Sequence, residues 1–207
     1  HIAQLAGANV PIVLIDSAQP MLATLSRVMV DDVAGGQTAV EHLIQLGHER
    51  IGFIGDIVDT PFHFTSSRDR YLGYCTALKE ACIALRPEYY AEGEHGRAQA
   101  REMAKTMLSL PEAPTAIFAA SDTQAVGVLE GARDRGLNVP GDLSIVGYDD
   151  IEIADIMGLT TMRQLLFESG RLGAESLLAI LDDPEAIPLQ RVLSAALVVR
   201  DTTAPPS

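Results

Sequence analysis

The sequence predicts an α/β fold in which a mostly parallel β-sheet is covered by helices on both faces. Short apolar runs alternate along the chain with longer stretches in which apolar residues recur at helical spacing. Strands that alternate with helices form βαβ units, whose strands run parallel. The 207 residues are 47% hydrophobic and 21% charged, which is ordinary for one or two compact soluble domains.

The first predicted strands are the apolar runs at residues 11–15 (PIVLI) and 27–30 (RVMV). A helix follows the second run, because Asp31 and Asp32 are good N-terminal caps and the next residues repeat apolar side chains on one face. Gly47 ends this helix, since glycine readily adopts the left-handed conformation that closes helices.

The next strand is residues 50–55 (RIGFIG), and Ser66 and Ser67 then cap a helix that continues with helical spacing to residue 82. The same alternation continues to the end of the chain, after a weak strand at 89–93. The later elements are a helix at 96–110, a strand at 115–120, a helix at 121–136, a strand at 142–148, a helix at 166–181 and a strand at 195–200.

Polar residues follow most of these strands, at the edge where open α/β sheets bind ligands. Asp31, Asp32 and Asp122 stand where helix caps belong, so capping explains them best. The residues after Asp149 are only weakly helical, and a structural role and a ligand contact both stay open for this carboxylate. The strand-end residues are Asp16, Asp31, Asp32, Gly55, Asp56, Ser121, Asp122, Asp149 and Asp150.

Two arginines, Arg68 and Arg70, lie in the first turn of the helix after Ser67. Helix N-termini favour anions, so cations there are better explained if they face carboxylates or a polar ligand across a cleft. A solvated surface pair is the alternative. His48 has the setting of a structural residue, whereas His95 could line a cleft or cap a helix.

Several functional classes lack support in the sequence. It contains no G-x-G-x-x-G, Walker A, G-x-S-x-G or H-E-x-x-H motif. Adjacent aspartates project in different directions and so do not converge on a metal ion. We therefore expect no enzyme, no cofactor and no metal site. The net charge of −13 disfavours binding of a nucleic-acid backbone by this chain.

The chain also lacks membrane and secretion signals. No apolar run is long enough to span a bilayer, and no basic stretch leads into an apolar one at the start. Cys75 and Cys82 lie too far apart on one helix to form a disulfide, which suits a reducing compartment. We expect a cytoplasmic protein without membrane contact.

Five motifs occur together in a characteristic order. They are VDDVAGGQTAVEHLIQLGHERIGFIGD, SSRDRYLGYCTAL, PTAIFAASDTQAVGVLEGARDRGLNVPGDLSIVGYDD, LTTMRQ and ALVVRDTT. With these motifs, essentially the whole chain resembles the effector-binding domain of the lactose-repressor (LacI/GalR) family of bacterial transcription regulators. The resemblance implies a type I periplasmic-binding-protein fold, in which two parallel-sheet subdomains clasp a small molecule, usually a sugar or a purine.

The resemblance also implies partners and site residues. Family members form homodimers through this domain and bind operator DNA through an N-terminal helix-turn-helix, which is absent from this chain. Ser121 stands where several members have Asn, and Gly158 replaces the usual Pro before LTT. The ligand contacts of the family fall on Asp16, Arg70, His95, Ser121, Asp149 and Gln164.

The start of the chain resembles the second helix and third strand of the family domain, so we expect the N-terminal subdomain to be incomplete. On this mapping it comprises residues 1–30 and 165–192, the C-terminal subdomain comprises 31–163 and 193–203, and residues 204–207 fray. A periplasmic sugar-binding protein of a transport system shares the fold and is the main alternative. A metal-using α/β enzyme is a weaker one.

Overall fold

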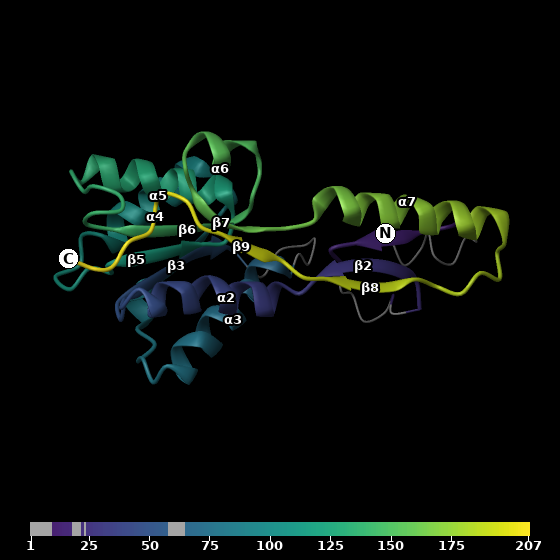
Figure 1. The fold of residues 1–207 in the computed structure, drawn as a ribbon, viewed down its shortest axis with the longest axis horizontal. Helices are drawn as coiled ribbons and strands as arrows, with labels where there is room; N and C mark the ends of the chain where they lie inside the picture. The colour runs from purple at the N-terminus through teal and green to yellow at the C-terminus, as the bar shows by residue number, and fades with distance from the viewer. Residues whose placement is uncertain (1–9, 18–21, 23, 58–64) are drawn as a thin grey trace.

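The chain folds into two lobes that lie end to end along the long axis of the molecule (Figure 1). The structure is a computed structural model that describes residues 10–17, 22, 24–57 and 65–207. A six-stranded sheet forms the larger lobe and a three-stranded sheet the smaller one. The helix that we expect within residues 1–9 lies outside the described residues.

The larger sheet has the strand order β4-β3-β5-β6-β7-β9. All neighbouring strands run parallel except β9, which pairs antiparallel with β7. The strands are β3 (Ile51–Asp56), β4 (Tyr90–Gly93), β5 (Ala116–Ala119), β6 (Ser144–Asp149), β7 (Thr160–Arg163) and β9 (Ala196–Val198).

Helices cover both faces of the larger sheet (Figure 1). Because side chains alternate along a strand, Phe53 of β3 packs in one core with Tyr148, and Ile54 packs in the other with Ile117. The helices α2 (Asp32–Gln45) and α3 (Ser66–Glu80) lie on the first side, and α4 (Arg97–Met107) and α5 (Asp122–Asp134) lie on the second. Two short helices, η2 (Pro87–Tyr89) and α6 (Glu152–Ile156), complete this lobe.

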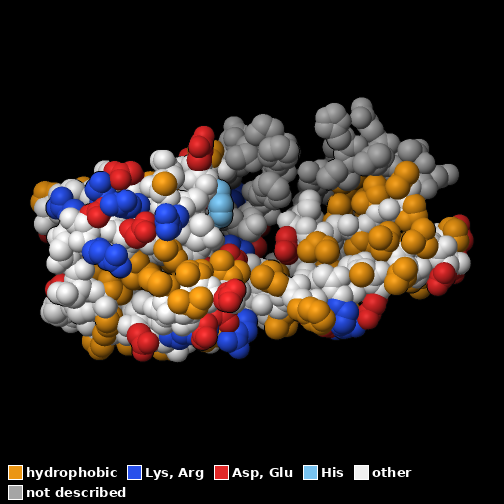
Figure 2. All heavy atoms as spheres, turned by 90° about the horizontal axis from the view of Figure 1, so that it is seen from above, with side chains coloured by type: hydrophobic (Ala, Val, Ile, Leu, Met, Phe, Trp, Pro, Cys, Tyr) orange, Lys and Arg blue, Asp and Glu red, His pale blue; other side chains and the backbone are white. Residues whose placement is uncertain are grey.

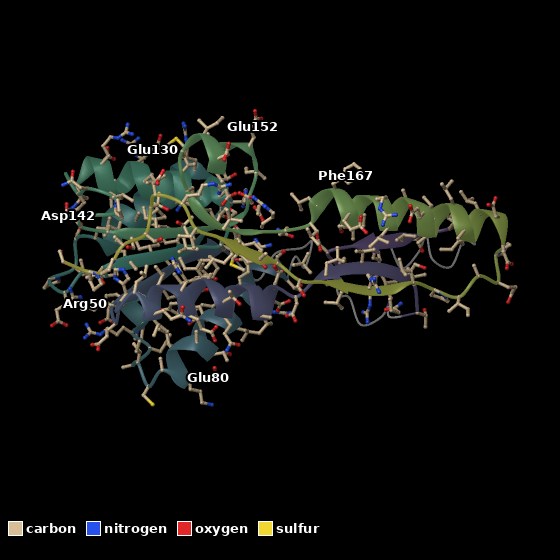
Figure 3. The ribbon with its side chains drawn as sticks, in the orientation of Figure 1. Arg50, Glu80, Glu130, Asp142, Glu152 and Phe167 are labelled. Atoms are coloured by element: carbon tan, nitrogen blue, oxygen red, sulfur yellow. The ribbon has the colours of Figure 1, made fainter. Side chains whose placement is uncertain are left out.

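The smaller lobe contains β1 (Val13–Ile15), β2 (Ser26–Val30) and β8 (Gln190–Leu193), which pair in parallel in the order β1-β2-β8. The long helix α7 (Leu166–Asp182) covers one face of this sheet. Hydrophobic side chains gather on the surface of this lobe (Figure 2). Phe167 of α7 points away from the sheet and is 85% exposed (Figure 3).

The α/β fold class with mainly parallel sheets is confirmed, and four elements, η2, α6, β7 and β8, were not anticipated from the apolar pattern. The strand β8 has mostly exposed side chains and therefore no apolar pattern, and α6 is only five residues long. Leu193, which we assigned to the C-terminal subdomain, pairs with Val30 in the three-stranded sheet of the smaller lobe. Fraying is the wrong description for Ala204, whose carbonyl lies 2.9 Å from Nε2 of the buried His48.

The helices α2 and α3 approach each other so closely that glycine is required at their crossing. A Cβ atom on Gly73 would lie 2.2 Å from the carbonyl oxygen of Val33, and one on Gly36 would lie 2.3 Å from that of Arg70. Any larger residue must push the helices apart. Because Arg70 is itself on α3, this close contact between the helices also fixes the position of Arg70 relative to α2.

We expect Gly73→Ala to lower the free energy of unfolding by about 1–3 kcal/mol, which is the usual cost of overpacking. Gly170→Ala is the matched control, because the site in α7 has no atom within 4 Å of the new methyl group. That change should raise stability by up to about 1 kcal/mol, since alanine favours helix interiors. Urea unfolding of the two variants checks this, and equal effects would contradict the close crossing.

Candidate ligand-binding site

A cavity of about 570 Å³ lies between the two lobes. Its walls come from the carboxyl ends of strands in both sheets, together with the first turns of α3 and the residues after β4 and β7. All six residues expected to contact a ligand line this one cavity. The lining residues are Asp16, Asp56, Ile57, Ser66, Ser67, Arg70, Gly93, Glu94, His95, Ser121, Asp149 and Gln164.

Two of the lining carboxylates sit on strained backbone at strand ends. Asp16 has a φ of 51° and Asp149 a φ of 114°, values that side chains other than glycine rarely adopt. Such strain costs about 1–3 kcal/mol per residue and tends to persist at functional sites.

Arg70 is the buried cation of the site. Its Nε donates to Asp32 Oδ1 at 2.8 Å, its Nη1 donates to the carbonyl of Ala120 at 2.6 Å, and Nη1 lies 3.5 Å from Asp149 Oδ1. The guanidinium stacks 3.7 Å above the centre of the Tyr148 ring. These contacts fix the group in one orientation, so it faces the cavity without needing to reorganise.

The role expected for Asp32 is therefore wrong, because Asp32 pairs with Arg70 and does not cap α2. Asp31 is the cap, and its Oδ1 accepts from the backbone N–H of Ala34 at 3.0 Å. Burial raises the pKa of Asp32, although the Arg70 guanidinium acts in the opposite direction. Arg68, in contrast, lies on the surface and pairs with Asp69.

Asp149 ends β6, Gln164 follows the neighbouring strand β7, and the two side chains contact each other. The amide Nε2 of Gln164 donates to Asp149 Oδ1 at 2.5 Å, and the Asp149 side chain remains 22% exposed. Burial raises the pKa of Asp149 above its ordinary value. The adjacent Asp150 has a different role, because it forms ion pairs with Arg163 and Arg200.

Asp16 contributes a buried oxygen that lacks a partner. Its Oδ1 has no hydrogen bond from any of the residues that the structure describes. Burial, followed by the negative charge of Asp32, raises the pKa of this carboxyl. A buried acceptor without a donor is costly, so this oxygen is suited to a ligand O–H or N–H.

Ser121 and His95 belong to a hydrogen-bonded chain that sequence reasoning missed. The hydroxyl of Ser121 donates to Gln124 Oε1 at 3.0 Å, and Gln124 Nε2 donates to Asp56 Oδ1 at 2.8 Å. His95 Nδ1 lies 3.0 Å from the same Asp56 oxygen. The position of Asp56 after a strand was visible in the sequence, but nothing there indicated its pairing with Gln124.

Capping is also the wrong role for Asp122, since Ser121 is the N-cap of α5. Asp122 is fully buried, and it accepts from Thr161 Oγ1 at 2.6 Å and from the N–H of Ile151 at 2.9 Å. Burial raises its pKa to about 6 despite these two donors. Asp122 thus joins β7 and the segment after β6 to the start of α5.

This shift predicts a pH dependence of stability. The unfolded chain releases the Asp122 proton near its ordinary pKa of 3.8, and the folded chain releases it only near 6. The folded state therefore binds more protons in between, and the contribution of Asp122 to stability falls as the pH rises through this window. Urea unfolding from pH 4 to 7 should show a smaller loss of stability for Asp122→Asn than for the wild type, because the raised pKa values of Asp16, Asp32 and Asp149 still contribute in the variant. If stability falls equally with pH in the wild type and in Asp122→Asn, the raised pKa of Asp122 is contradicted.

Among the described residues, no three His, Cys, Asp or Glu side chains are grouped so that they could hold a metal ion. Within the same residues, no helix is long and apolar enough to cross a membrane. The described residues of the cavity offer carboxylates, a guanidinium, and amide, imidazole and hydroxyl groups.

The chain matches the model of the periplasmic binding protein-like domain over residues 40–203. It is 32% identical over 181 residues to the probable HTH-type transcriptional repressor ExuR of Bacillus subtilis, covering 86% of this chain and 53% of that protein. It is 34% identical over 199 residues to the HTH-type transcriptional repressor CytR of Escherichia coli, with 93% and 56% covered. The chain thus spans about half the length of these curated relatives.

A solved structure agrees with these relatives. A LacI family transcriptional regulator from Enterococcus faecium with bound ribose superimposes with a TM-score of 0.88 at 26% identity, covering 98% of this chain and 74% of the other. The match extends over both lobes and the cavity between them. The chain therefore belongs to the periplasmic binding protein-like domain family, in the form carried by the LacI-family transcriptional regulators.

Proposed function

We propose that this chain is the effector-sensing part of a bacterial DNA-binding transcriptional regulator, and that it binds a neutral, polar small molecule between its lobes. The observation that carries the proposal is the convergence of Asp16, Arg70, His95, Ser121, Asp149 and Gln164, drawn from both lobes, on one cavity. A ligand that contacts both lobes fixes how they lie relative to each other, which is how such a domain can signal.

The chemistry of the lining supports a sugar or a nucleoside-like effector. Carboxylates and an amide arranged around a cavity suit hydroxyl groups and ring nitrogens, and the buried Oδ1 of Asp16 requires a donor. The similarity to a regulator with bound ribose agrees with this chemistry. The repressor names of the relatives favour a regulator over a transport protein or an enzyme.

The first test is ligand-dependent thermal stability. We expect a neutral monosaccharide or nucleoside to stabilise the chain, by about 2.7 kcal/mol when its concentration is a hundred times its dissociation constant. The same molecule should alter the affinity of the whole regulator for its operator in a gel shift. If no such molecule stabilises the chain, the proposed function is wrong.

The partners in this proposal are the effector, a second copy of the chain in a homodimer, and operator DNA bound through a separate domain. We expect the chain by itself to bind no duplex DNA at physiological salt, because its net charge of −13 repels the phosphate backbone. Fluorescence anisotropy with a labelled duplex at 50 and 150 mM salt checks this. Salt-sensitive binding by the isolated chain would contradict the proposal that a separate domain binds the operator.

A further inference from the structure

We infer that Asp56 is a further ligand-binding residue, and that it makes the cavity select donor-rich ligands without negative charge. This inference rests on the proposed function and adds to it the residue that makes the cavity reject anions. Asp56 ends β3, lines the cavity and keeps 34% of its side chain exposed there. Its carboxylate is hydrogen-bonded to Gln124 and His95, whereas Arg70 is paired with Asp32.

The carboxylate of Asp56 is held in place before any ligand arrives. Gln124 is fully buried, and the Ser121 hydroxyl occupies its Oε1, which leaves Nε2 to donate to Asp56. The backbone N–H of Asp56 donates to Ser67 Oγ at 2.8 Å. A preorganised acceptor binds a ligand donor with little loss of side-chain entropy.

The hydrogen bonds to Asp56 also leave part of it available. Gln124 and His95 both reach Oδ1, and Oδ2 receives no hydrogen bond from the described residues. The free oxygen of an exposed carboxylate in a cavity can accept from a hydroxyl or an amine. A ligand carboxylate offers it no proton at neutral pH, and a phosphate monoester is mostly a dianion there, so neither group is a good donor to this oxygen.

The charges around the cavity strengthen this preference. Among the residues that the structure describes, four carboxylates line it, against one guanidinium. That guanidinium is already paired with Asp32 at 2.8 Å, behind the lining, and lies 3.5 Å from Asp149. The cavity thus offers an anion no unpaired cation among the described residues, and a second negative charge beside Asp56 is repelled. The four carboxylates are Asp16, Asp56, Glu94 and Asp149.

The test compares neutral probes with their anionic derivatives by isothermal titration calorimetry. The pairs are D-ribose with D-ribose 5-phosphate, D-glucose with D-glucuronate, and adenosine with adenosine 5′-monophosphate. We expect the wild-type chain to bind a neutral member and to reject its anionic partner. In Asp56→Asn the neutral probe should bind about tenfold more weakly, and the affinity of its anionic derivative relative to the neutral probe should rise at least about tenfold.

Two further variants separate the effect of the Asp56 charge from the effect of its positioning. Asp182→Asn, at the exposed end of α7, removes the same charge far from the cavity and should leave both affinities unchanged. Gln124→Leu removes the donor that positions Asp56 but keeps its charge, so the neutral probe should bind more weakly while the anion stays rejected. Thermal unfolding of each variant verifies that it is folded.

The outcomes distinguish this inference from the proposed function. If no neutral probe binds the wild type, both are wrong. If a neutral probe binds, and Asp56→Asn changes the ratio of anionic to neutral affinity no more than Asp182→Asn does, the inference alone is overturned. A wild-type chain that binds an anionic derivative more tightly than its neutral parent overturns it as well.

Discussion

Replacing Arg70 with methionine should lower the free energy of unfolding by about 3–5 kcal/mol, the cost of leaving one partner of a buried ion pair alone. The change strands the buried carboxylate of Asp32, and it removes the donor to the Ala120 carbonyl and the cation above the Tyr148 ring. Urea unfolding at pH 7 measures the loss. The same variant should bind no effector, because the cavity loses the guanidinium itself, the cation that lies 3.5 Å from Asp149.

Arg68→Met is the matched control for this prediction, two residues away on the same helix. Its side chain is 47% exposed and pairs with Asp69 at the surface, so the change should cost less than about 1 kcal/mol. The double variant Asp32→Leu/Arg70→Met should recover part of the loss, since neither charge is then buried alone. A cost below about 1 kcal/mol for Arg70→Met would contradict the buried ion pair.

Replacing Asp149 with asparagine should weaken effector binding by about 10- to 100-fold, which corresponds to the 1.5–3 kcal/mol of a hydrogen bond to a charged group. Asparagine has the same shape and tolerates the positive φ of 114° at this position. The loss should therefore reflect the missing charge and not a rearranged strand end. Isothermal titration calorimetry with the neutral molecule that stabilises the wild type measures the loss.

Asp142→Asn provides the control, because this exposed carboxylate accepts its hydrogen bonds from Asn138 and is absent from the cavity lining. It removes the same charge and should leave affinity unchanged. Thermal unfolding of Asp149→Asn should stay close to that of the wild type, although the Arg70 guanidinium loses a neighbour at 3.5 Å. An unchanged affinity for Asp149→Asn would remove Asp149 from the site.

Much of the fold could be predicted because its signals are local. The runs at β3, β5 and β6 are largely apolar on both sides, as strands between two layers of helices must be. β3 and β6 end in an aspartate, and Ser121 follows β5 after one alanine. The elements that escaped prediction lack such a signal. Most side chains of β8 are exposed, and the strand is held by its backbone bonds to β2.

The position of the site was easier to predict from the sequence than the role of each residue in it. The carboxyl ends of parallel strands meet at one edge of a sheet, which brings Ser121 and Asp149 together whatever their partners are. Asp16 follows a strand of the other sheet, and it reaches the same cavity only because the two lobes face each other. The roles of neighbouring aspartates were harder to separate. Asp31 and Asp32 both suit a helix cap, and only the approach of Arg70 assigns the second to an ion pair.

The sequence by itself determined the alternation of strands and helices, the polar strand ends and the resemblance to a regulatory family, because these depend on residue order and local spacing. The tertiary structure decided which carboxylates are paired and which face the cavity. Arg70 meets Asp32 across 38 residues, Gln124 meets Asp56 across 68, and His48 meets Ala204 across 156. Burial and charge at each aspartate are set by such distant contacts, which no local pattern records.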